Sequence, residues 1–317
     1  MNTHSLVRQR GVAVVTALLL TTLAITIVAS LFWQQQVQVR SIENQRLQLQ
    51  KQWILRGALD WTRLILREDK RITPNVDHLG EPWAVPLAET RLDEYVENGS
   101  ANTDVPDAAL SGGIVDAQAR FNLANLSQNG TINPTEVAVF SRLLNNARQN
   151  PALAQAAANL MASAQRKPPE GGRDPDSSSS QPMRIMHTED LLAVPGFTPA
   201  ILDSIRDFIV VLPSPTKINV NTAPGEVLAA RIDTLSVSDA AALVTARERA
   251  WFRNEAEFTQ RLQTQGKQLG TGSGQIAVNT NYFLVNGNVR LNRAGMRMQA
   301  LIDRTDRNPK VVWIRED

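Results

Sequence analysis

The pattern of apolar and polar positions changes once within the N-terminal part of the chain. From Val12 to Trp33 the sequence runs for 22 residues without a charged side chain, directly after the basic stretch Arg8-Gln9-Arg10-Gly11. A helix of that length rises by about 1.5 Å per residue and crosses the roughly 30 Å hydrocarbon core of a bilayer. Residues 12–33 are therefore predicted to form a transmembrane helix.

Helical periodicity continues beyond this uncharged segment. Apolar residues recur at spacings of 7, 4, 3 and 4, at Leu47, Ile54, Ala58, Trp61 and Ile65. Charged residues lie mostly between them. The helix should end near Arg71, because Pro74 disfavours helical backbone in Thr73. We predict one long helix, amphipathic in its second half, with Trp53 and Trp61 packed in a core against a sheet.

Helical patterns dominate the middle of the chain. Between Pro74 and Gly113 prolines interrupt the sequence, and only a short helix from Leu87 to Val96 is expected. Two short strands around a turn are predicted within residues 113–122. Further helices are predicted at Thr135–Asn146, Ala152–Gln165, Thr188–Leu192, Pro199–Val211, Ser238–Arg249 and Asn254–Leu262, and one within Ile218–Ala230 that Thr222 caps and Pro224 begins.

Two segments depart from helical periodicity. Residues 166–182 contain no apolar side chain other than proline and are predicted to be a mobile loop, because they cannot bury enough surface to become ordered. After a flexible connection at Gly270–Gly274 the period changes to two, which predicts antiparallel strands. Turns are expected at Asn286-Gly287 and at Arg307-Asn308-Pro309. Strands before and after the helices predict an α+β fold, with a helical domain inserted into a sheet that the long N-terminal helix covers.

Composition narrows the possible functions only slightly. The chain has 317 residues, a formal net charge of +2 and no cysteine. The small net charge gives no long-range field that would favour nucleic acid or an acidic substrate. The absence of cysteine excludes disulfides and thiol chemistry.

Three interpretations compete for the N-terminus. A secretory signal peptide would have a shorter apolar core, although Val28-Ala29-Ser30 resembles its cleavage site. A plain membrane anchor fits the length but gives Gly11 no role. The third is a leader like that of type IV pilins, in which a peptidase cuts after Gly11, where the missing side chain allows close approach, and Val12 becomes the new N-terminus. The basic leader adjoins the apolar segment directly, which favours a cytoplasmic N-terminus.

Residues typical of an enzyme are scarce. The histidines are His4, His78 and His187, and a leader peptidase would remove the first. The glycine-rich run at 270–274 is neither a nucleophile elbow nor a phosphate-binding loop, because it lacks the required serine position and the lysine. The sequence therefore predicts no enzymatic activity.

DNA binding is the main alternative function. The segment Ile218–Pro224 with the following helices resembles helix-hairpin-helix modules, in which Lys217 and Arg247 would be the basic contacts. Its glycine hairpin is missing, because Leu235-Ser236-Val237 stands in that place. Between His187 and Leu262 seven basic residues face ten acidic ones, a net charge of −3, whereas phosphate binding requires a basic surface.

Several groups of oxygen-bearing side chains could hold calcium, which takes about six to eight oxygen ligands. They lack the spacing of a calcium-binding loop, so a solvated surface is the competing interpretation for each. The groups are Asp174 and Asp176 with Ser177–Ser180, Glu189 with Asp190, and Asp303 with Asp306.

Four segments in this order resemble type II secretion system protein K, the largest minor pseudopilin of the general secretion pathway. They are Arg10–Ala13, Gly80–Ala84, Asp116–Leu123 and Ile218–Pro224. The resemblance implies a pilin-like fold and a non-enzymatic role in a tip complex that initiates a short pseudopilus and helps to export folded proteins across the outer membrane. It implies cleavage between Gly11 and Val12, possible N-methylation of Val12, and a calcium-binding soluble part with no assignable ligands.

The same resemblance implies a set of partners and a location. The partners are the minor pseudopilins of the I, J and H classes, the major pseudopilin, the prepilin peptidase and the inner-membrane assembly platform, with no nucleic acid. The location is the inner membrane, with a single span, a cytoplasmic N-terminus and a periplasmic soluble part. The expected division is a leader at 1–11, a transmembrane helix at 12–33, a stalk helix at 34–72, pilin-like segments at 73–123 and 276–317, and the inserted domain at 124–275.

Thr16 is the residue that points to a position in the filament. It is the fifth residue after the predicted cut, where most pilin-like proteins carry glutamate. In those relatives the carboxylate is thought to pair with the N-terminal amine of the subunit already in place. Thr16 cannot make that pair, but its hydroxyl can bond to a carbonyl of the preceding helical turn. We predict that this subunit is first in the filament, and the alternative is that Thr16 is simply a tolerated residue of the membrane helix.

Overall fold

The computed structural model describes residues 10–91, 108–165, 183–291 and 294–316. It contains two compact units, residues 1–54 and residues 55–317. Helix α1 (Arg10–Ile72) passes from the first unit into the second. The predicted mobile loop at 166–182 lies outside the described residues.

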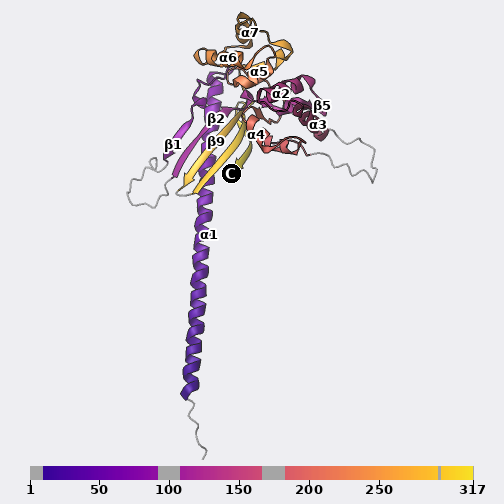
Figure 1. Cartoon of the computed structure of the whole chain (residues 1–317). Helices are drawn as coiled ribbons and strands as arrows, with labels where there is room; N and C mark the ends of the chain where they lie inside the picture. Colours follow the sequence, from indigo (N-terminus) through magenta and orange to yellow (C-terminus); the bar gives the residue numbers. More distant parts are fainter. Residues whose placement is uncertain (1–9, 92–107, 166–182, 292–293, 317) are drawn as a thin grey trace, which may run out of the picture. The chain divides into compact units, whose positions relative to one another are not determined.

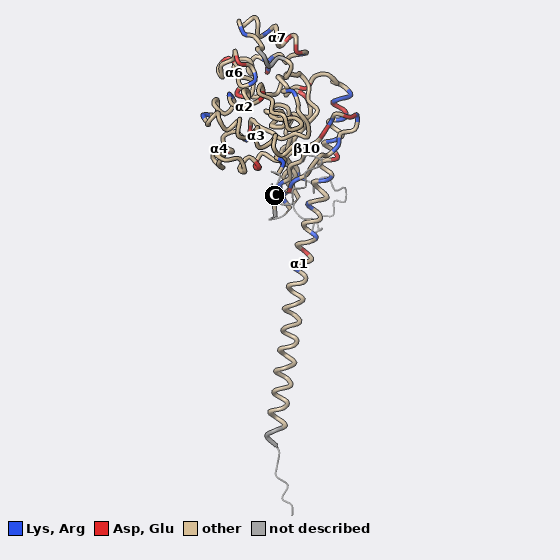
Figure 2. The backbone as a smooth tube through the Cα atoms, turned by 90° about the vertical axis from the view of Figure 1, so that its right-hand side faces the viewer, with Lys and Arg blue, Asp and Glu red and all other residues tan. Residues whose placement is uncertain are grey.

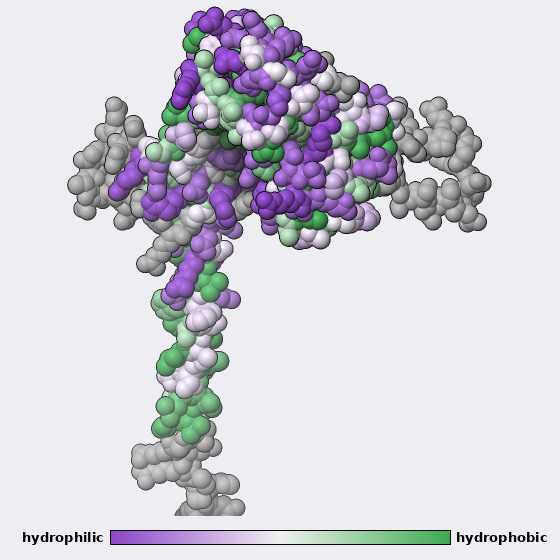
Figure 3. All heavy atoms as spheres, turned by 45° about the horizontal axis from the view of Figure 1, so that its top comes forward, coloured by the Kyte–Doolittle hydropathy of each residue, from purple (hydrophilic) through white to green (hydrophobic). Residues whose placement is uncertain are grey.

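The apolar part of α1 is exposed along its whole length. Residues 13–46 are all exposed, and in Figure 2 a long stretch of α1 carries neither blue nor red. Green and white spheres cover this part of the helix in Figure 3. By length and composition α1 is the one helix of the described residues that is able to cross a membrane. Large exposed aliphatic side chains such as Leu20 and Ile25 are stable in a lipid environment.

The second unit is built on a five-stranded sheet of order β1-β2-β9-β10-β11, in which all neighbours are antiparallel. Its strands are β1 (Leu87–Arg91), β2 (Ala108–Asp116), β9 (Tyr282–Leu291), β10 (Ala294–Asp303) and β11 (Lys310–Glu316). The residues between β2 and β9 carry the helices, and Asp116 at the end of β2 pairs with Phe283 at the start of β9. The helical region is thus an insertion between two neighbouring strands (Figure 1).

The C-terminal part of α1 supplies one face of the sheet's core. Leu55, Leu59 and Leu66 are at most 3% exposed, and Thr62 and Asp69 continue the same stripe. The predicted stripe was therefore displaced by one residue, and Trp53 and Trp61, 68% and 50% exposed, are not core residues. The period was correct, but two tryptophans were assigned to the wrong face.

The insertion has its own hydrophobic core, which runs from Phe121 to Val278. Its elements are α2 (Pro134–Asn146), α3 (Leu153–Gln165), η5 (Thr188–Ala193), α4 (Pro199–Ile205), α5 (Gly225–Arg231), α6 (Val237–Arg249), α7 (Glu255–Thr264) and the 3-10 helices η3 (Ala117–Ala119), η4 (Leu123–Leu126) and η6 (Gly270–Gln275). Short strand pairs accompany them: β3 (Phe121–Asn122) with β6 (Ile209–Val210), β4 (Ser127–Gln128) with β5 (Thr131–Ile132), and β7 (Ile218–Asn219) with β8 (Ile276–Ala277). The short 3-10 helix η1 (Pro82–Ala84) precedes β1.

Most predicted helices of the insertion are confirmed, whereas several local predictions need correction. The helix expected from Leu87 is strand β1 as far as Arg91, because pairing with β2 overrides its local helical preference. The helix predicted to reach Val211 ends at Ile205, and the β-branched Ile209 and Val210 pair with β3 instead. Residues 188–193 and 270–275 form 3-10 helices, where an α-helix and a flexible connection were expected.

The predicted turn at Asn286-Gly287 is also wrong. Both residues lie in the middle of β9, where Gly287 is paired with Gly112 of β2 and Met298 of β10. A Cβ added at Gly112 would lie 2.3 Å from the carbonyl oxygen of Asn286, so this glycine permits close approach of two strands. The turn predicted at residues 307–309 does lie between β10 and β11.

Candidate interaction sites

The predicted processing site lies in the first turn of α1. Gly11 and Val12 follow Arg10, the first helical residue described. The hydroxyl of Thr16 donates to the carbonyl oxygen of Ala13 at 3.0 Å, in the preceding helical turn. The predicted hydrogen bond of Thr16 is confirmed, whereas cleavage after Gly11 and the role of Thr16 in the filament stay predictions.

A buried arginine joins the end of α1 to the sheet and to the loop after α1. The guanidinium of Arg304, a residue 2% exposed, donates to Asp69 at 2.6 Å, to Asp77 and to the carbonyl oxygen of Thr280 at 2.9 Å. Its carbon atom lies 4.5 Å from the centre of the Phe283 ring. The Arg304 side chain therefore holds the end of β10 together with the segment from Asp69 to Asp77 and with Thr280.

Burial changes the proton affinity of the acidic residues in this cluster. Desolvation raises the pKa of Asp69 to about 6, with a further increase from Glu81, against the opposing effect of Arg304. Desolvation also raises the pKa of Asp77 to about 7, again against Arg304 and the amide of Thr280. These carboxyl groups therefore take up protons close to neutral pH.

Glu81 extends the cluster towards the segment Gly80–Ala84. Its carboxylate accepts from the indole of Trp83 and the hydroxyl of Thr73, both at 2.8 Å, and from the amide of His78 at 3.0 Å. Trp83 is 1% exposed, and its ring lies 5.2 Å from that of Phe283. This segment therefore anchors the chain between α1 and β1.

The segment Ile218–Pro224 ties the insertion to the end of β2. Thr222 donates its hydroxyl hydrogen to Asp116 at 2.6 Å, and the amide of Asn219 donates to Asp116 at 2.9 Å and to the carbonyl oxygen of Asp77 at 3.1 Å. Burial raises the pKa of Asp116 above its usual value, and these hydrogen bonds offset only part of that increase. The prediction that Thr222 caps a helix is wrong. Its hydroxyl donates to Asp116 instead, and α5 begins at Gly225 with Pro224 as the capping residue.

The segment Asp116–Leu123 completes this junction through buried amides. Gln118 donates to the carbonyl oxygen of Lys217 at 3.0 Å and accepts from the amide of Asn281 at 2.7 Å. Asn122 donates to the carbonyl oxygen of Ser214 at 2.8 Å. Buried amides are stable only with such partners. The contacts of the Asp116–Leu123 and Ile218–Pro224 segments therefore stabilise the fold.

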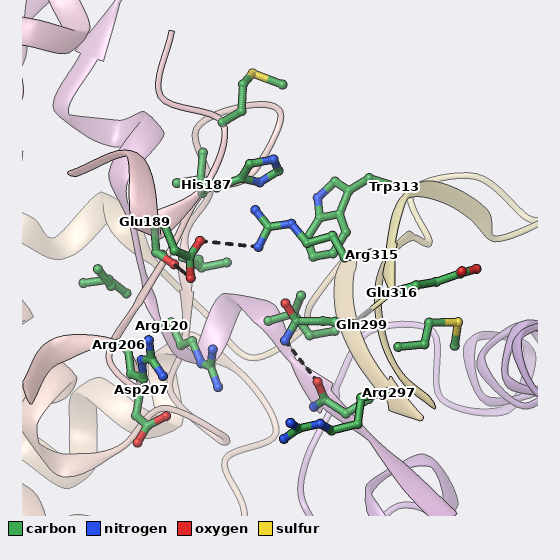
Figure 4. Close-up of a pocket in the computed structure, with 18 of the residues that line it drawn as sticks. Arg120, His187, Glu189, Arg206, Asp207, Arg297, Gln299, Trp313, Arg315 and Glu316 are labelled. Carbon is green, nitrogen blue, oxygen red and sulfur yellow. Dashed lines mark hydrogen bonds and ion pairs between the residues drawn. The ribbon is translucent and has the colours of Figure 1, made fainter. Parts of the chain in front are cut away.

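A groove lined by both polar and apolar side chains lies between the sheet and the insertion (Figure 4). It has a volume of about 1030 Å³. One wall consists of β9, β10 and β11, with Asn286, Gln299 and Trp313, and the other consists of residues around η5 and the segment 206–211. Arg120 and Arg297 reach into it from opposite walls. Except for Arg120, which lies within a matching segment, no pattern in the sequence indicated these residues, because strands and helices far apart in the chain form the groove.

The described candidate groups for calcium already have protein partners. Glu189 pairs with Arg315 at 3.4 Å, Asp190 accepts from the backbone amides of residues 186 and 187, and Asp306 pairs with Lys310. Asp303 accepts from the amide of Thr305 at 2.7 Å. Among the described residues Asp69, Asp77 and Glu81 also lie close together, but the guanidinium of Arg304 already neutralises Asp69 and Asp77. Asp174, Asp176 and Ser177–Ser180 lie outside the described residues, and calcium binding stays a prediction.

The geometry also argues against the alternative of DNA binding. Arg247 is 6% exposed and donates to the carbonyl oxygen of Val220 at 2.7 Å. Lys217 is exposed but lies 3.3 Å from Glu255. The first residue cannot reach a phosphate without unfolding, and the second is already neutralised.

An apolar N-terminal helix whose C-terminal part covers an antiparallel sheet defines a pilin-like protein, and the helical insertion distinguishes a large member of that class. The description "Type II secretion system (T2SS), protein K" belongs to two family models that match residues 119–214 and 218–279. The type II secretion system protein K of Pseudomonas aeruginosa is 31% identical, over 94% of this chain and 89% of that protein. The corresponding protein of Klebsiella pneumoniae is 25% identical over 97% and 96%. This chain belongs to the type II secretion system protein K family and is a minor pseudopilin.

A solved structure supports the fold independently. It is that of the GspK-GspI-GspJ complex from the type II secretion system of enterotoxigenic Escherichia coli, and one chain is 20% identical with a TM-score of 0.64. The match covers 88% of this chain and 99% of that chain. The predicted α+β pilin-like fold is confirmed.

Proposed function

We propose that this chain is the subunit that initiates the pseudopilus, at the tip of the filament, and so helps to export folded proteins across the outer membrane. The observation that carries this proposal is the insertion of a helical domain between β2 and β9. A domain of that size beside the sheet would obstruct a further subunit stacked beyond it. Its role is to bind and organise other proteins, without enzymatic activity.

The proposed neighbours are two further minor pseudopilins, of the I and J classes. The related chain of known structure was solved in a complex with GspI and GspJ. The minor pseudopilin of the H class, the major pseudopilin and the inner-membrane assembly platform complete the proposed set of partners. Long N-terminal helices are the surfaces through which we expect these subunits to associate.

The N-terminus of α1 is proposed to be processed and to define the topology. The prepilin peptidase cuts between Gly11 and Val12, and Val12 carries the new, methylated N-terminus. Residues 12–33 then span the inner membrane once, with the N-terminus in the cytoplasm and the second unit in the periplasm. The uncharged stretch that follows the basic Arg8 and Arg10 supports this topology.

Processing is tested by N-terminal sequencing of the membrane-bound protein. Gly11→Val should leave a full-length precursor, because a side chain at this position blocks access of the peptidase. Gly57→Val is the matched control, since a Cβ at Gly57 would meet no atom within 4 Å. A mature N-terminus at Leu31, or an uncleaved wild-type chain, would refute the pilin-like leader.

The tip position is tested by the location of the protein in assembled filaments. Protein carrying a gold-labelled tag should be found at one end of each pseudopilus and should co-purify with the I- and J-class subunits. Thr16→Glu should leave secretion largely intact, because the inserted domain sets the position. Labelling spaced along the filament would show that the tip assignment is wrong.

A further inference from the structure

The groove between the sheet and the insertion has the features of a binding site for another protein. Along β9, Gly287 faces α1, because a Cβ added there would lie 3.3 Å from Leu55. Side chains alternate between the faces of a strand, so Asn286 and Asn288 point to the opposite face. Trp313 packs over one end of that face, against Leu284 and Leu301. The remaining polar area forms the floor of the groove.

The acidic side chains of the groove already have partners or lie away from its centre. Glu189 pairs with Arg315, and Asp190 accepts from two backbone amides. Glu316 points away from the centre of the groove in Figure 4. Asp207 attracts Arg120 electrostatically and lies at the edge of the wall. The Glu189 carboxylate lies within the groove, where Arg315 matches its charge, and no described acidic side chain lies between Arg120 and Arg297 in the middle region of Figure 4.

Two arginines face this middle region. Within the described part of the chain the guanidinium groups of Arg120 and Arg297 donate no hydrogen bond. Arg297 is exposed, whereas Arg120 is half-buried, and burial lowers the pKa of Arg120 while Asp207 and Asp116 raise it. An arginine stays charged in such surroundings. A partly desolvated guanidinium with unused donors is stabilised by a carboxylate, which accepts two parallel hydrogen bonds.

The surroundings of the two arginines favour an extended protein segment over a small anion. Trp313 and the 58% exposed Met186 line the same groove and offer apolar contacts. Strand β11 is the edge of the sheet, and no described residue bonds to the backbone of its outer side. Exposed edge strands recruit extended segments through main-chain hydrogen bonds.

We infer that this groove binds an extended acidic segment of another protein, whose carboxylate side chains contact Arg120 and Arg297 while its backbone runs beside β11. The inference does not require a tip position, so it can fail while the proposed function holds. Two arginines are too few to hold the backbone of a nucleic acid, which needs many phosphate contacts.

The test uses full-length protein in detergent micelles and a fluorescent peptide of alternating glutamate and valine with both ends blocked. Fluorescence anisotropy should show saturable binding that weakens with added salt. A peptide with lysine in place of glutamate should not bind. Arg297→Gln should weaken binding about tenfold, the factor that corresponds to 1.4 kcal/mol. Arg249→Gln changes an exposed arginine on α6, remote in sequence from the groove residues, and should leave binding unchanged.

The remaining outcomes decide against the inference. Equal weakening by Arg297→Gln and Arg249→Gln would indicate attraction to the general surface charge. Complete displacement by inorganic phosphate at the concentration of the peptide would indicate a small-anion site. If the acidic peptide does not bind the folded wild-type protein, the inference is wrong. Unchanged binding by Arg297→Gln, with a melting temperature equal to that of the wild type, would also overturn it. Arg120→Gln serves as a second variant where its melting temperature matches that of the wild type.

Discussion

The buried ion pair between Glu136 and Arg231 is expected to be the most costly pair in the insertion to break on one side. Arg231 donates to both carboxylate oxygens of Glu136, at 2.6 and 2.8 Å, and joins α5 to α2. The two side chains are 0% and 2% exposed. The guanidinium carbon also lies 5.8 Å from the centre of the Phe121 ring.

Glu136→Gln keeps the shape of this side chain but removes its charge. Arg231 would then be a buried cation without a counter-ion, and its Nε already has no hydrogen-bond partner. Removal of one partner from a buried pair costs about 3–5 kcal/mol, because the other charge stays desolvated. Urea denaturation of the full-length protein in detergent micelles should show this loss in the free energy of unfolding. Hydrogen exchange should accelerate in α2 and α5.

Two controls separate this cost from other effects. Glu255→Gln breaks the Lys217–Glu255 pair, whose side chains are 47% and 48% exposed, and should cost less than about 1 kcal/mol. The double variant Glu136→Leu with Arg231→Met removes both charges and should recover most of the stability. A loss below about 1 kcal/mol for Glu136→Gln, or a double variant less stable than the single one, would refute the reasoning.

Further predictions concern the sheet and its arginine cluster. The folded-state pKa values of Asp69 and Asp77, about 6 and about 7, exceed the unfolded value of 3.8, so the folded protein binds more protons. Their contribution to stability is complete below pH 3.8 and is lost as the pH rises through 7, at about 1.4 kcal/mol for each unit of pKa difference. Melting temperatures corrected for the other titrating groups should therefore fall between about pH 4 and pH 7, and Asp77→Asn should flatten the profile. Gly112→Val should prevent accumulation of folded protein, as judged by proteolysis, because its Cβ would lie 2.3 Å from a carbonyl oxygen of β9, whereas Gly295→Val meets no atom within 4 Å and should be tolerated.

The sequence predicted those parts of the fold that local patterns determine. The long helix and the helices α2, α3, α6 and α7 have the periodicity or caps that identify them, and the structure confirms them. The periodicity of α1 could not locate its buried face to within one residue. Trp53 and Trp61 are as apolar as core residues, and only the sheet determines which side is covered.

Strand pairing accounts for other errors. Asn286-Gly287 has the local composition of a turn but lies in the middle of β9, because β2 and β10 pair with it on both sides. The residues of β1 favour a helix locally, and pairing with β2 prevails. Such interactions depend on residues far away in the chain and leave no local signal.

The site residues were predictable to different degrees. The cleavage residues Gly11 and Val12 follow from the linear pattern of a basic leader and an apolar helix. Arg304 was missed, although it joins Asp69 to Asp77, because its partners are more than 200 positions away in the sequence. A buried arginine has no distinctive neighbours along the chain, and its role becomes visible only in three dimensions.

The pairing of Asp116 with Phe283 means that the insertion leaves and re-enters the sheet at a single rung of the ladder. An insertion with adjacent ends adds no strain to its host and need not alter the pairing of β2 with β9. A tight hairpin at this point would leave every pairing of β2 with β9 in place. The ladder between β2 and β9 therefore does not depend on the length of the insertion, whereas the partners of Asp116 and Arg304 do, because Thr222 and Thr280 belong to the inserted residues.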